Sequence, residues 1–285
     1  MIAIDWSRMA RPQEDGYDTE VVLHLATTTP SLLRSKPYQR QPVGDAPTLF
    51  DGRVAIRNRP TGGLPRPRYI PADPAHAHLS EAERLLGVWP AVANQFPALI
   101  DTLQPWIDTS ASHDDWLRLP GSSSHSNEAE FGVIMATVDS PIALAQAMVH
   151  EMAHHKLRAM GVSLLQAIRL VTNNPEDLYQ SPIITHKRRP MTAVLHAQYS
   201  FIHVTALDVA IFQDPAMSEH DRRLALYLLA RNVPRMEAGY AEIDAHIRTN
   251  ADGAQFIDAF KSWSRQVLDT GQSVLDANGY GAPSL

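Results

Sequence analysis

"DSPIALAQAMVHEMAHHKLRAMG", residues 139–161, predicts a single buried helix with well-defined ends. Ser140 is suited to cap the N-terminus, Pro141 to take the first helical position, and Gly161 to follow the last turn. The turns that precede the His-Glu pair are apolar on nearly every side, which is typical of a helix packed in a core. We therefore expect the rest of the chain to pack around this helix.

The polar residues of this helix have the spacing of a metal site. His150 and His154 are four positions apart, so both imidazoles leave the same face of a helix and can meet on one cation. Glu151 lies beside them, and this trio is costly in apolar surroundings unless a cation compensates it. The sequence therefore predicts a divalent metal held by His150 and His154. His155 points about 100° away from His154 and is expected to pack or to support the ligands from outside.

A third metal ligand is expected from a second apolar helix, because two helical histidines leave a metal incompletely coordinated. No later histidine follows His154 at the short spacing of a compact three-histidine motif. His196 lies in an apolar helical run, with Tyr199 and His203 at the third and seventh positions after it. We expect His196 to be the third ligand and Tyr199 and His203 to lie around the ligands, with a ligand role for His203 as the alternative.

A basic run, "HKRRP" at residues 186–190, directly precedes that second helix. Lys187 is expected to be solvated. Arg188 or Arg189 is a candidate to reach a carboxylate near the metal, because a planar guanidinium binds both carboxylate oxygens at once.

Residues 1–78 are expected to differ in character from the remainder. Proline and glycine recur there, which argues against long helices but allows short strands such as Arg53–Asn58. Apolar groups such as "VVLHLA" favour an ordered, loop-rich N-terminal lobe over a disordered tail. Residues 79–285 are expected to form the helical metal-binding domain, and the two parts to form one compact unit.

The expected fold class is mainly α with a small β component, in which several long helices pack the central buried helix. Residues 79–103 have helical spacing behind Ser80 as an N-cap, with prolines that kink or divide the helix. Residues 114–121 and Phe131–Val138 are predicted as short strands, the second of buried type. Further helices, assigned to the scaffold, are expected at about 191–213, 218–248 and 253–276.

Composition excludes several classes of function. A net charge of −6 over 285 residues leaves no basic surplus for general nucleic-acid binding. The absence of cysteine excludes disulfides, thiolate metal sites and cysteine nucleophiles. No uninterrupted apolar run reaches the length of a membrane span, and the N-terminus does not resemble a secretion signal, so we expect a cytoplasmic protein without a membrane partner.

The ordered set of motifs resembles a known family. "MVHEMAHHKL" at 148–157 and "SPIITHKRRPMTAVLHAQYSFIHV" at 181–204 resemble the HExxH motif-containing peptide modification proteins of ribosomal peptide gene clusters. These are 2-oxoglutarate-dependent peptide β-hydroxylases. The resemblance covers residues 130–215, and "LHA" stands where the family more often has "LHG".

The resemblance implies a bacterial cytoplasmic Fe(II)/2-oxoglutarate-dependent dioxygenase that hydroxylates the β-carbon of a residue in a precursor peptide or free amino acid. His150, His154 and His196 would be its iron ligands, and Arg189, or Arg188, would hold the distal carboxylate of 2-oxoglutarate. Glu151 would then orient a ligand or complete the coordination of the metal.

Two other functions fit the same residues. In a zinc metallopeptidase, Glu151 would be the general base for metal-bound water, and the Phe131–Val138 strand would pair with an extended substrate as a sheet edge. Such an enzyme would need a downstream glutamate ligand, for which Glu237 and Glu242 are poor candidates, since both lie in exposed-looking helix. The third reading is a binding or regulatory protein whose metal motif has lost catalysis.

Overall fold

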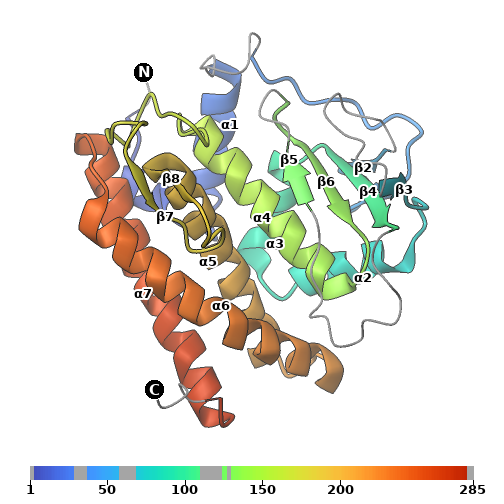
Figure 1. Cartoon of the computed structure of the whole chain (residues 1–285). Helices are drawn as coiled ribbons and strands as arrows, with labels where there is room; N and C mark the ends of the chain where they lie inside the picture. The colour runs from blue at the N-terminus through green and yellow to red at the C-terminus, as the bar shows by residue number, and fades with distance from the viewer. Residues whose placement is uncertain (1–2, 29–36, 58–68, 110–123, 127–129, 281–285) are drawn as a thin grey trace.

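The computed structural model describes residues 3–28, 37–57, 69–109, 124–126 and 130–280. The fold is mainly α with a small β component, as the sequence predicts. A mixed sheet lies on one side of the central helix and a group of long helices on the other (Figure 1). None of the helices in these ranges combines the length and the apolar character needed to cross a bilayer.

The main sheet has the strand order β1-β2-β4-β6-β5, and β3 also pairs with β4. Strand β4 runs parallel to both β2 and β6, whereas β5 is antiparallel to β6. The strands are β1 (Thr48–Leu49), β2 (Val54–Ile56), β3 (Tyr69–Pro71), β4 (Thr102–Asp108), β5 (Ser124–Ser126) and β6 (Val133–Thr137). The predicted strand at Phe131–Val138 is thus confirmed as β6. It lies between β4 and β5, so the expectation that it forms an edge is wrong.

The segment predicted as a divided helix at 79–103 contains two helices and the start of a strand. Helix α2 (Ala77–Leu86) begins behind His76, whose ring accepts a hydrogen bond from the His78 amide, so Ser80 is not the N-cap. Helix α3 (Pro90–Leu99) follows, and β4 then begins at Thr102. Helical spacing does not reveal β4, because its backbone hydrogen bonds come from distant strands. The strand expected at 114–121 lies outside the described residues.

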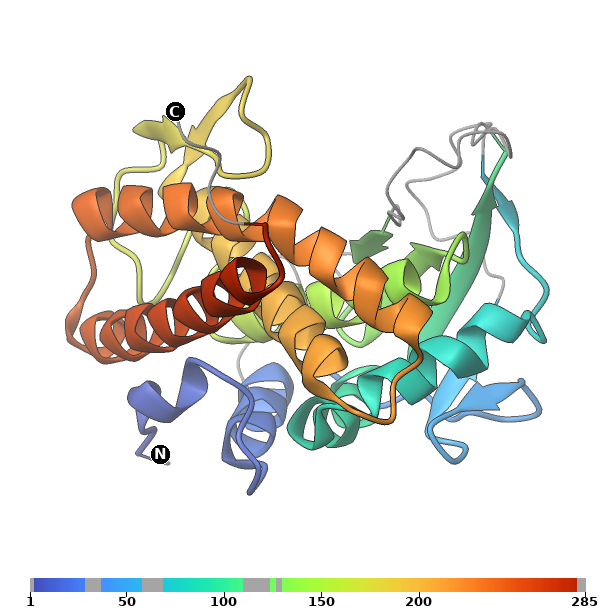
Figure 2. The same cartoon turned by 90° about the horizontal axis from the view of Figure 1, so that it is seen from below.

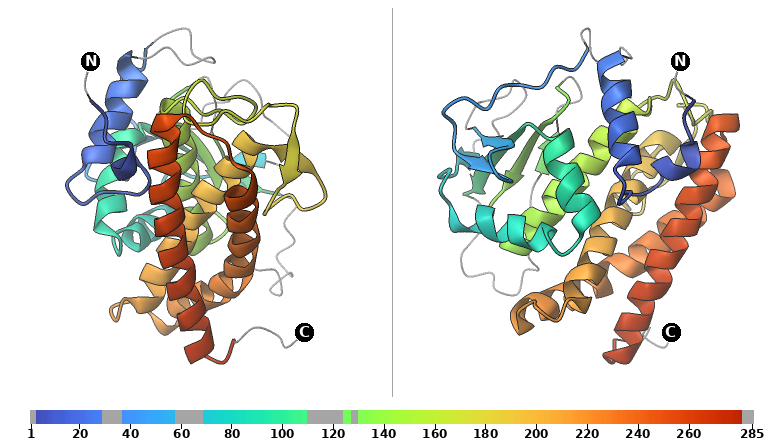
Figure 3. Two further views of the ribbon diagram at one scale, coloured as in Figure 1. Left: turned by 90° about the vertical axis from the view of Figure 1, so that its left-hand side faces the viewer. Right: turned by 180° about the vertical axis from the view of Figure 1, so that it is seen from behind.

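Helix α4 (Pro141–Ala159) is the predicted central helix, and its ends are formed as expected. The Ser140 hydroxyl accepts from the Ala143 amide, and Pro141 takes the first helical position. Gly161 follows the C-cap with a φ of 92°, a left-handed conformation that suits glycine. Figures 1 and 3 show α4 between the sheet and the long helices, which explains why nearly all of its side chains are buried.

The C-terminal scaffold also agrees with the sequence. Helices α5 (Met191–Gln213), α6 (Glu219–His246) and α7 (Ala251–Ala277) are within a few residues of the predicted ranges. Ser218 and Asn250 cap the last two through side-chain oxygens. Before α5, a small hairpin is formed by β7 (Leu178–Gln180) and β8 (Arg188–Pro190).

The N-terminal segment is less irregular than predicted. It contains a short 3-10 helix, η1 (Trp6–Met9), and the 12-residue helix α1 (Tyr17–Thr28). The segment "VVLHLA" lies inside α1, and the stretch from Tyr17 to Thr29 contains neither proline nor glycine. Of the predicted strand at Arg53–Asn58, Val54–Ile56 forms β2, and Asn58 lies outside the described residues.

The described part of this segment packs against the helical core. Helix η1 lies along α7, and α1 packs near α3 and α4, as Figures 2 and 3 show. The Lys156 ammonium on α4 lies 2.6 Å from the Asp18 carboxylate of α1, and both side chains are fully buried. Gln95 of α3 donates to the same carboxylate and accepts from Lys156, which completes a buried network of three helices.

Candidate metal centre

His150, Glu151 and His154 form a group on α4 that can hold a metal ion. One ligand atom from each of them lies within 4.8 Å of the others. The two Nε2 atoms are 3.0 Å apart, and Glu151 Oε1 is 3.9 Å from His150 Nε2. Two nitrogens that share one metal at bond lengths of about 2.1 Å are separated by about 3 Å, so the two imidazoles fit a divalent cation without rearrangement.

Both imidazoles are in the protonation state that a metal requires. Burial lowers the pKa of His150 despite the opposing effect of Glu151. The pKa of His154 lies well below its ordinary value, first because of burial and then because of the neighbouring His150 and His196. Each ring is therefore neutral near pH 7 and has a lone pair to offer, as a metal ligand must.

Glu151 is held in place by the neighbouring strand β5. The Ser124 hydroxyl donates to Oε1 at 2.7 Å, and the Ser126 hydroxyl donates to Oε2 at 2.5 Å. Arg158, two turns after Glu151 on α4, donates to the Ser126 hydroxyl at 2.7 Å. Because Glu151 is only 3% exposed, these donors replace the water that an ionised carboxylate would otherwise need. They also direct the carboxylate toward the two imidazoles.

His196 lies behind His154 and outside the metal-binding group. Its Nδ1 is 2.8 Å from His154 Nδ1, and its Nε2 is 2.9 Å from the Val162 carbonyl oxygen. Both of its ring nitrogens are therefore engaged. In this arrangement His196 contacts His154 from the side opposite His150, and its role as third ligand stays a prediction. The packing of α5 on α4 places the His196 ring beside Nδ1 of His154, the nitrogen that does not contact His150.

The hydrogen bonds of His196 also determine the tautomer of His154. The Val162 carbonyl can only accept, so we assign the proton of His196 to Nε2 and the lone pair to Nδ1. His154 Nδ1 must then donate, which leaves the lone pair of His154 on Nε2, the atom that faces His150. Histidine ligands in metal sites are commonly held in this way by a partner on the second nitrogen.

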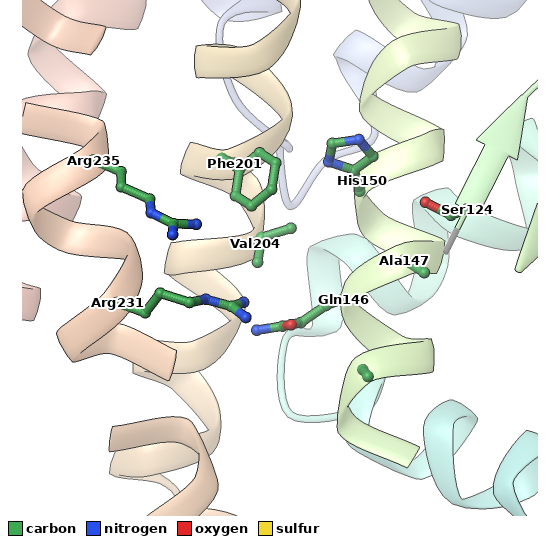
Figure 4. A pocket seen from close by; sticks show the side chains of 9 residues that line it. Ser124, Gln146, Ala147, His150, Phe201, Val204, Arg231 and Arg235 are labelled. Atoms are coloured by element: carbon green, nitrogen blue, oxygen red, sulfur yellow. The ribbon is translucent and has the colours of Figure 1, made fainter. Parts of the chain in front are cut away.

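A cavity of about 300 Å³ opens beside His150. One wall is α4, with His150 and Gln146, and the floor is α5, where Phe201 packs edge-on against the His150 ring at a centroid distance of 5.0 Å. Arg231 and Arg235 of α6 face these residues from the opposite wall (Figure 4). The cavity therefore brings His150, one residue of the candidate metal group, together with two cationic side chains.

The arginines predicted for this position are elsewhere. Arg188 and Arg189 lie in β8, where Arg188 is exposed, and neither lines the cavity. Arg189 is close enough to His196 for its charge to contribute to the lowered pKa of that ring. Sequence reasoning missed Arg231 and Arg235. The sequence contains a pattern that could have indicated them: two arginines four positions apart interrupt the apolar run "LLARNVPRM". This run lies in a helix that the sequence analysis assigns to the scaffold.

The remaining predicted residues, His155, Tyr199 and His203, are buried in the core. His155 Nε2 lies 3.2 Å from the Val133 carbonyl of β6, so this ring ties α4 to the sheet. Tyr199 is fully buried and donates to the Met9 carbonyl at 3.3 Å. His203 Nδ1 bonds to the Tyr199 carbonyl, and its ring packs 4.7 Å from that of Trp263. Tyr199 and His203 thus belong to the contact of α5 with η1 and α7.

A scan against models of protein families found no match for this chain, and a search of curated proteins also found none. The arrangement of the site is therefore the ground for any statement about function.

Proposed function

We propose that the protein is an Fe(II)/2-oxoglutarate-dependent hydroxylase that acts at the β-carbon of a residue in a peptide or free amino acid. The observation that carries the proposal is the group of two imidazoles and one carboxylate, of which His150 lines a cavity that also contains two arginines. Two histidines and a carboxylate with open coordination positions are the ligand set typical of non-haem Fe(II) oxygenases. The expected precursor-peptide substrate and bacterial cytoplasmic location remain part of this proposal.

His150, His154 and Glu151 would hold the iron. With Fe(II) bound there, the available chemistry is the oxidation of 2-oxoglutarate by O₂ to succinate and CO₂, with the second oxygen atom inserted into a substrate C–H bond. The protein residues prepare the site for it. Ser124 and Ser126 hold the Glu151 carboxylate, His196 keeps the His154 lone pair on Nε2, and Phe201 covers one face of His150.

The test is turnover of 2-oxoglutarate by the intact protein reconstituted with Fe(II) under anaerobic conditions. After O₂ is admitted, we expect succinate to form in step with O₂ consumption, and faster when the peptide substrate is present. Protein loaded with Zn(II) is the matched control and should form none. Absence of succinate from protein that binds iron stoichiometrically would overturn the proposal.

A zinc metallopeptidase is a second candidate, and one observation favours it. Strand β5 pairs only with β6 among the described strands, and two of its residues contact Glu151. An extended peptide that paired with β5 would lie next to the carboxylate. With Glu151 as general base, Glu151→Gln should reduce hydrolysis by several orders of magnitude while the metal stays bound, whereas in the hydroxylase the same change removes an iron ligand and should weaken iron binding. Proteolysis that requires metal but neither O₂ nor 2-oxoglutarate would establish this candidate.

A further inference from the structure

Arg231 and Arg235 form a cationic wall across the cavity from His150. They lie one turn apart on α6, so both guanidinium groups leave the same face of the helix. Figure 4 shows both side chains extending from α6 toward the cavity, with Arg231 close to the Gln146 side chain and Arg235 closer to Phe201. The wall therefore faces the helix that carries the metal group.

No carboxylate in the described part of the chain forms an ion pair within 4.0 Å of either guanidinium. Arg231 Nε donates to the neighbouring Asn232 amide oxygen at 3.1 Å. The nearest buried acid, Asp208, accepts from Gln146 Nε2 at 2.6 Å and from Asn232 Nδ2 at 3.3 Å, so amides occupy both of its oxygens. Asp208 attracts Arg231 electrostatically without forming an ion pair with it, so both guanidinium groups can accept an anion that enters the cavity.

The spacing along α4 sets the size of a ligand that would use both ends of the cavity. Gln146 precedes His150 by four residues, which corresponds to about 6 Å along a helix axis. Suppose that one anionic group of a ligand lies beside Gln146 and Arg231. Its second anionic group would then reach His150 if the two groups were about one helical turn apart. Small dicarboxylates of four or five carbons have this reach.

We propose that Arg231 and Arg235 bind one carboxylate of a small dicarboxylate whose other end lies at the His150 metal group. The proposal rests on the proposed function, for which it identifies the residues that recognise the co-substrate. It also replaces Arg188 and Arg189 in that role. Arginine suits it because its planar fork binds both oxygens of a carboxylate, and such charge-assisted bonds are stronger in a partly dehydrated cavity.

The experiment is calorimetric titration of the intact protein, loaded with Mn(II) under anaerobic conditions, with 2-oxoglutarate, glutarate, succinate and adipate. We expect the five-carbon acids to bind most tightly. Arg231→Gln and Arg235→Gln should each weaken binding of 2-oxoglutarate by about tenfold or more, as expected for loss of a charged hydrogen bond. Arg231→Lys should be intermediate, because it keeps the charge but loses the fork. Circular dichroism and thermal melts identify any variant that is unfolded.

Two controls make the result specific. Arg223→Gln removes an exposed arginine of the same helix, which is paired with Glu219, and should leave binding unchanged. Arg188→Gln/Arg189→Gln tests the site predicted from the sequence and should also have no effect. Loss of binding in that double variant, or binding within twofold of wild type in Arg231→Gln/Arg235→Gln, would overturn the proposal. Preference of the wall for an acidic peptide over every dicarboxylate would also overturn it.

Failure of the function and failure of this inference give different results. If dicarboxylates bind through Arg231 and Arg235 but no succinate forms with iron and O₂, the binding role of the two arginines is supported and the hydroxylase proposal is wrong. If succinate forms with an unchanged KM for 2-oxoglutarate in Arg231→Gln/Arg235→Gln, the hydroxylase proposal is supported and the binding role of the two arginines is wrong.

Discussion

His196 Nδ1 lies 2.8 Å from His154 Nδ1, on the side of the His154 ring that faces away from His150. One imidazole thereby orients another: the Val162 carbonyl sets the tautomer of His196, and His196 in turn sets that of His154. The lone pair that a metal needs is consequently directed at the position between His154 and His150. This chain of contacts links α4 to α5 and to the loop after Gly161.

His196→Ala should weaken metal binding without abolishing it. Removal of a partner on the second nitrogen of a histidine ligand typically costs about 10-fold to 100-fold in metal affinity. Competition titration with a chromophoric chelator measures the affinity, and elemental analysis measures the stoichiometry. His150→Ala is the control and should lose the metal. If both variants lose it equally, His196 is a ligand and the positions of the rings change when metal binds.

Ser126→Ala should impair the site through Glu151. The Ser126 hydroxyl both donates to the carboxylate and accepts from Arg158, so its removal leaves the buried Glu151 and the half-buried Arg158 with one partner fewer. We expect metal affinity to fall by about 10-fold to 100-fold while the circular dichroism spectrum stays that of the folded protein. Ser273→Ala, on the exposed surface of α7, should match wild type. Unchanged metal affinity in Ser126→Ala would show that the position of Glu151 does not depend on β5.

Removal of one partner from the buried pair of Lys156 and Asp18 should destabilise the protein strongly. Lys156→Ala leaves the Asp18 carboxylate buried with Gln95 but without its cation, and the loss of one partner of a buried pair typically costs about 3–5 kcal/mol. Urea denaturation followed by circular dichroism measures the change. Arg223→Ala breaks an exposed pair on α6 and should cost less than about 1 kcal/mol. Equal effects of the two variants would contradict the importance assigned to the buried pair.

Asp208 should make the protein less stable as the pH rises toward neutrality. Burial raises its pKa from 3.8 to about 7, against the opposing effect of the Gln146 amide. At pH values between 3.8 and about 7, Asp208 is protonated in the folded protein and ionised in the unfolded chain. The free energy of unfolding therefore falls as the pH rises and levels off above about 7. The full difference corresponds to roughly 4 kcal/mol at most.

Asp208→Asn isolates this effect, because the amide does not titrate. The difference in free energy of unfolding between variant and wild type should change steadily from pH 5 to pH 7.5, with the wild type losing more stability. Urea titrations of both proteins across that range provide the measurement. Parallel curves would mean that Asp208 has the same pKa in the folded and unfolded protein.

Local patterns predicted the elements whose signals lie within one stretch of chain. The caps and apolar turns of α4, and the extents of α5 to α7, follow from side chains within a few residues of each helix end. Strand β4 was missed because its stabilising partners, β2 and β6, are distant in sequence. Helix α1 was missed because the prolines and glycines of the whole N-terminal segment obscured a short stretch that is free of them.

The pairing of His150 with His154 was determined by the sequence itself, because a helical repeat of 3.6 residues places positions four apart on one face whatever surrounds them. The tertiary structure determined where His196, Arg231 and Arg235 lie relative to the metal group. The packing of α5 on α4 directs His196 at the back of His154, and the crossing of α6 brings Arg231 and Arg235 to the cavity. Arg188 and Arg189 are nearer to His196 in sequence, yet in the β7–β8 hairpin neither of them lines the cavity. Distances between helices depend on how whole surfaces pack, and no spacing along the chain contains that information.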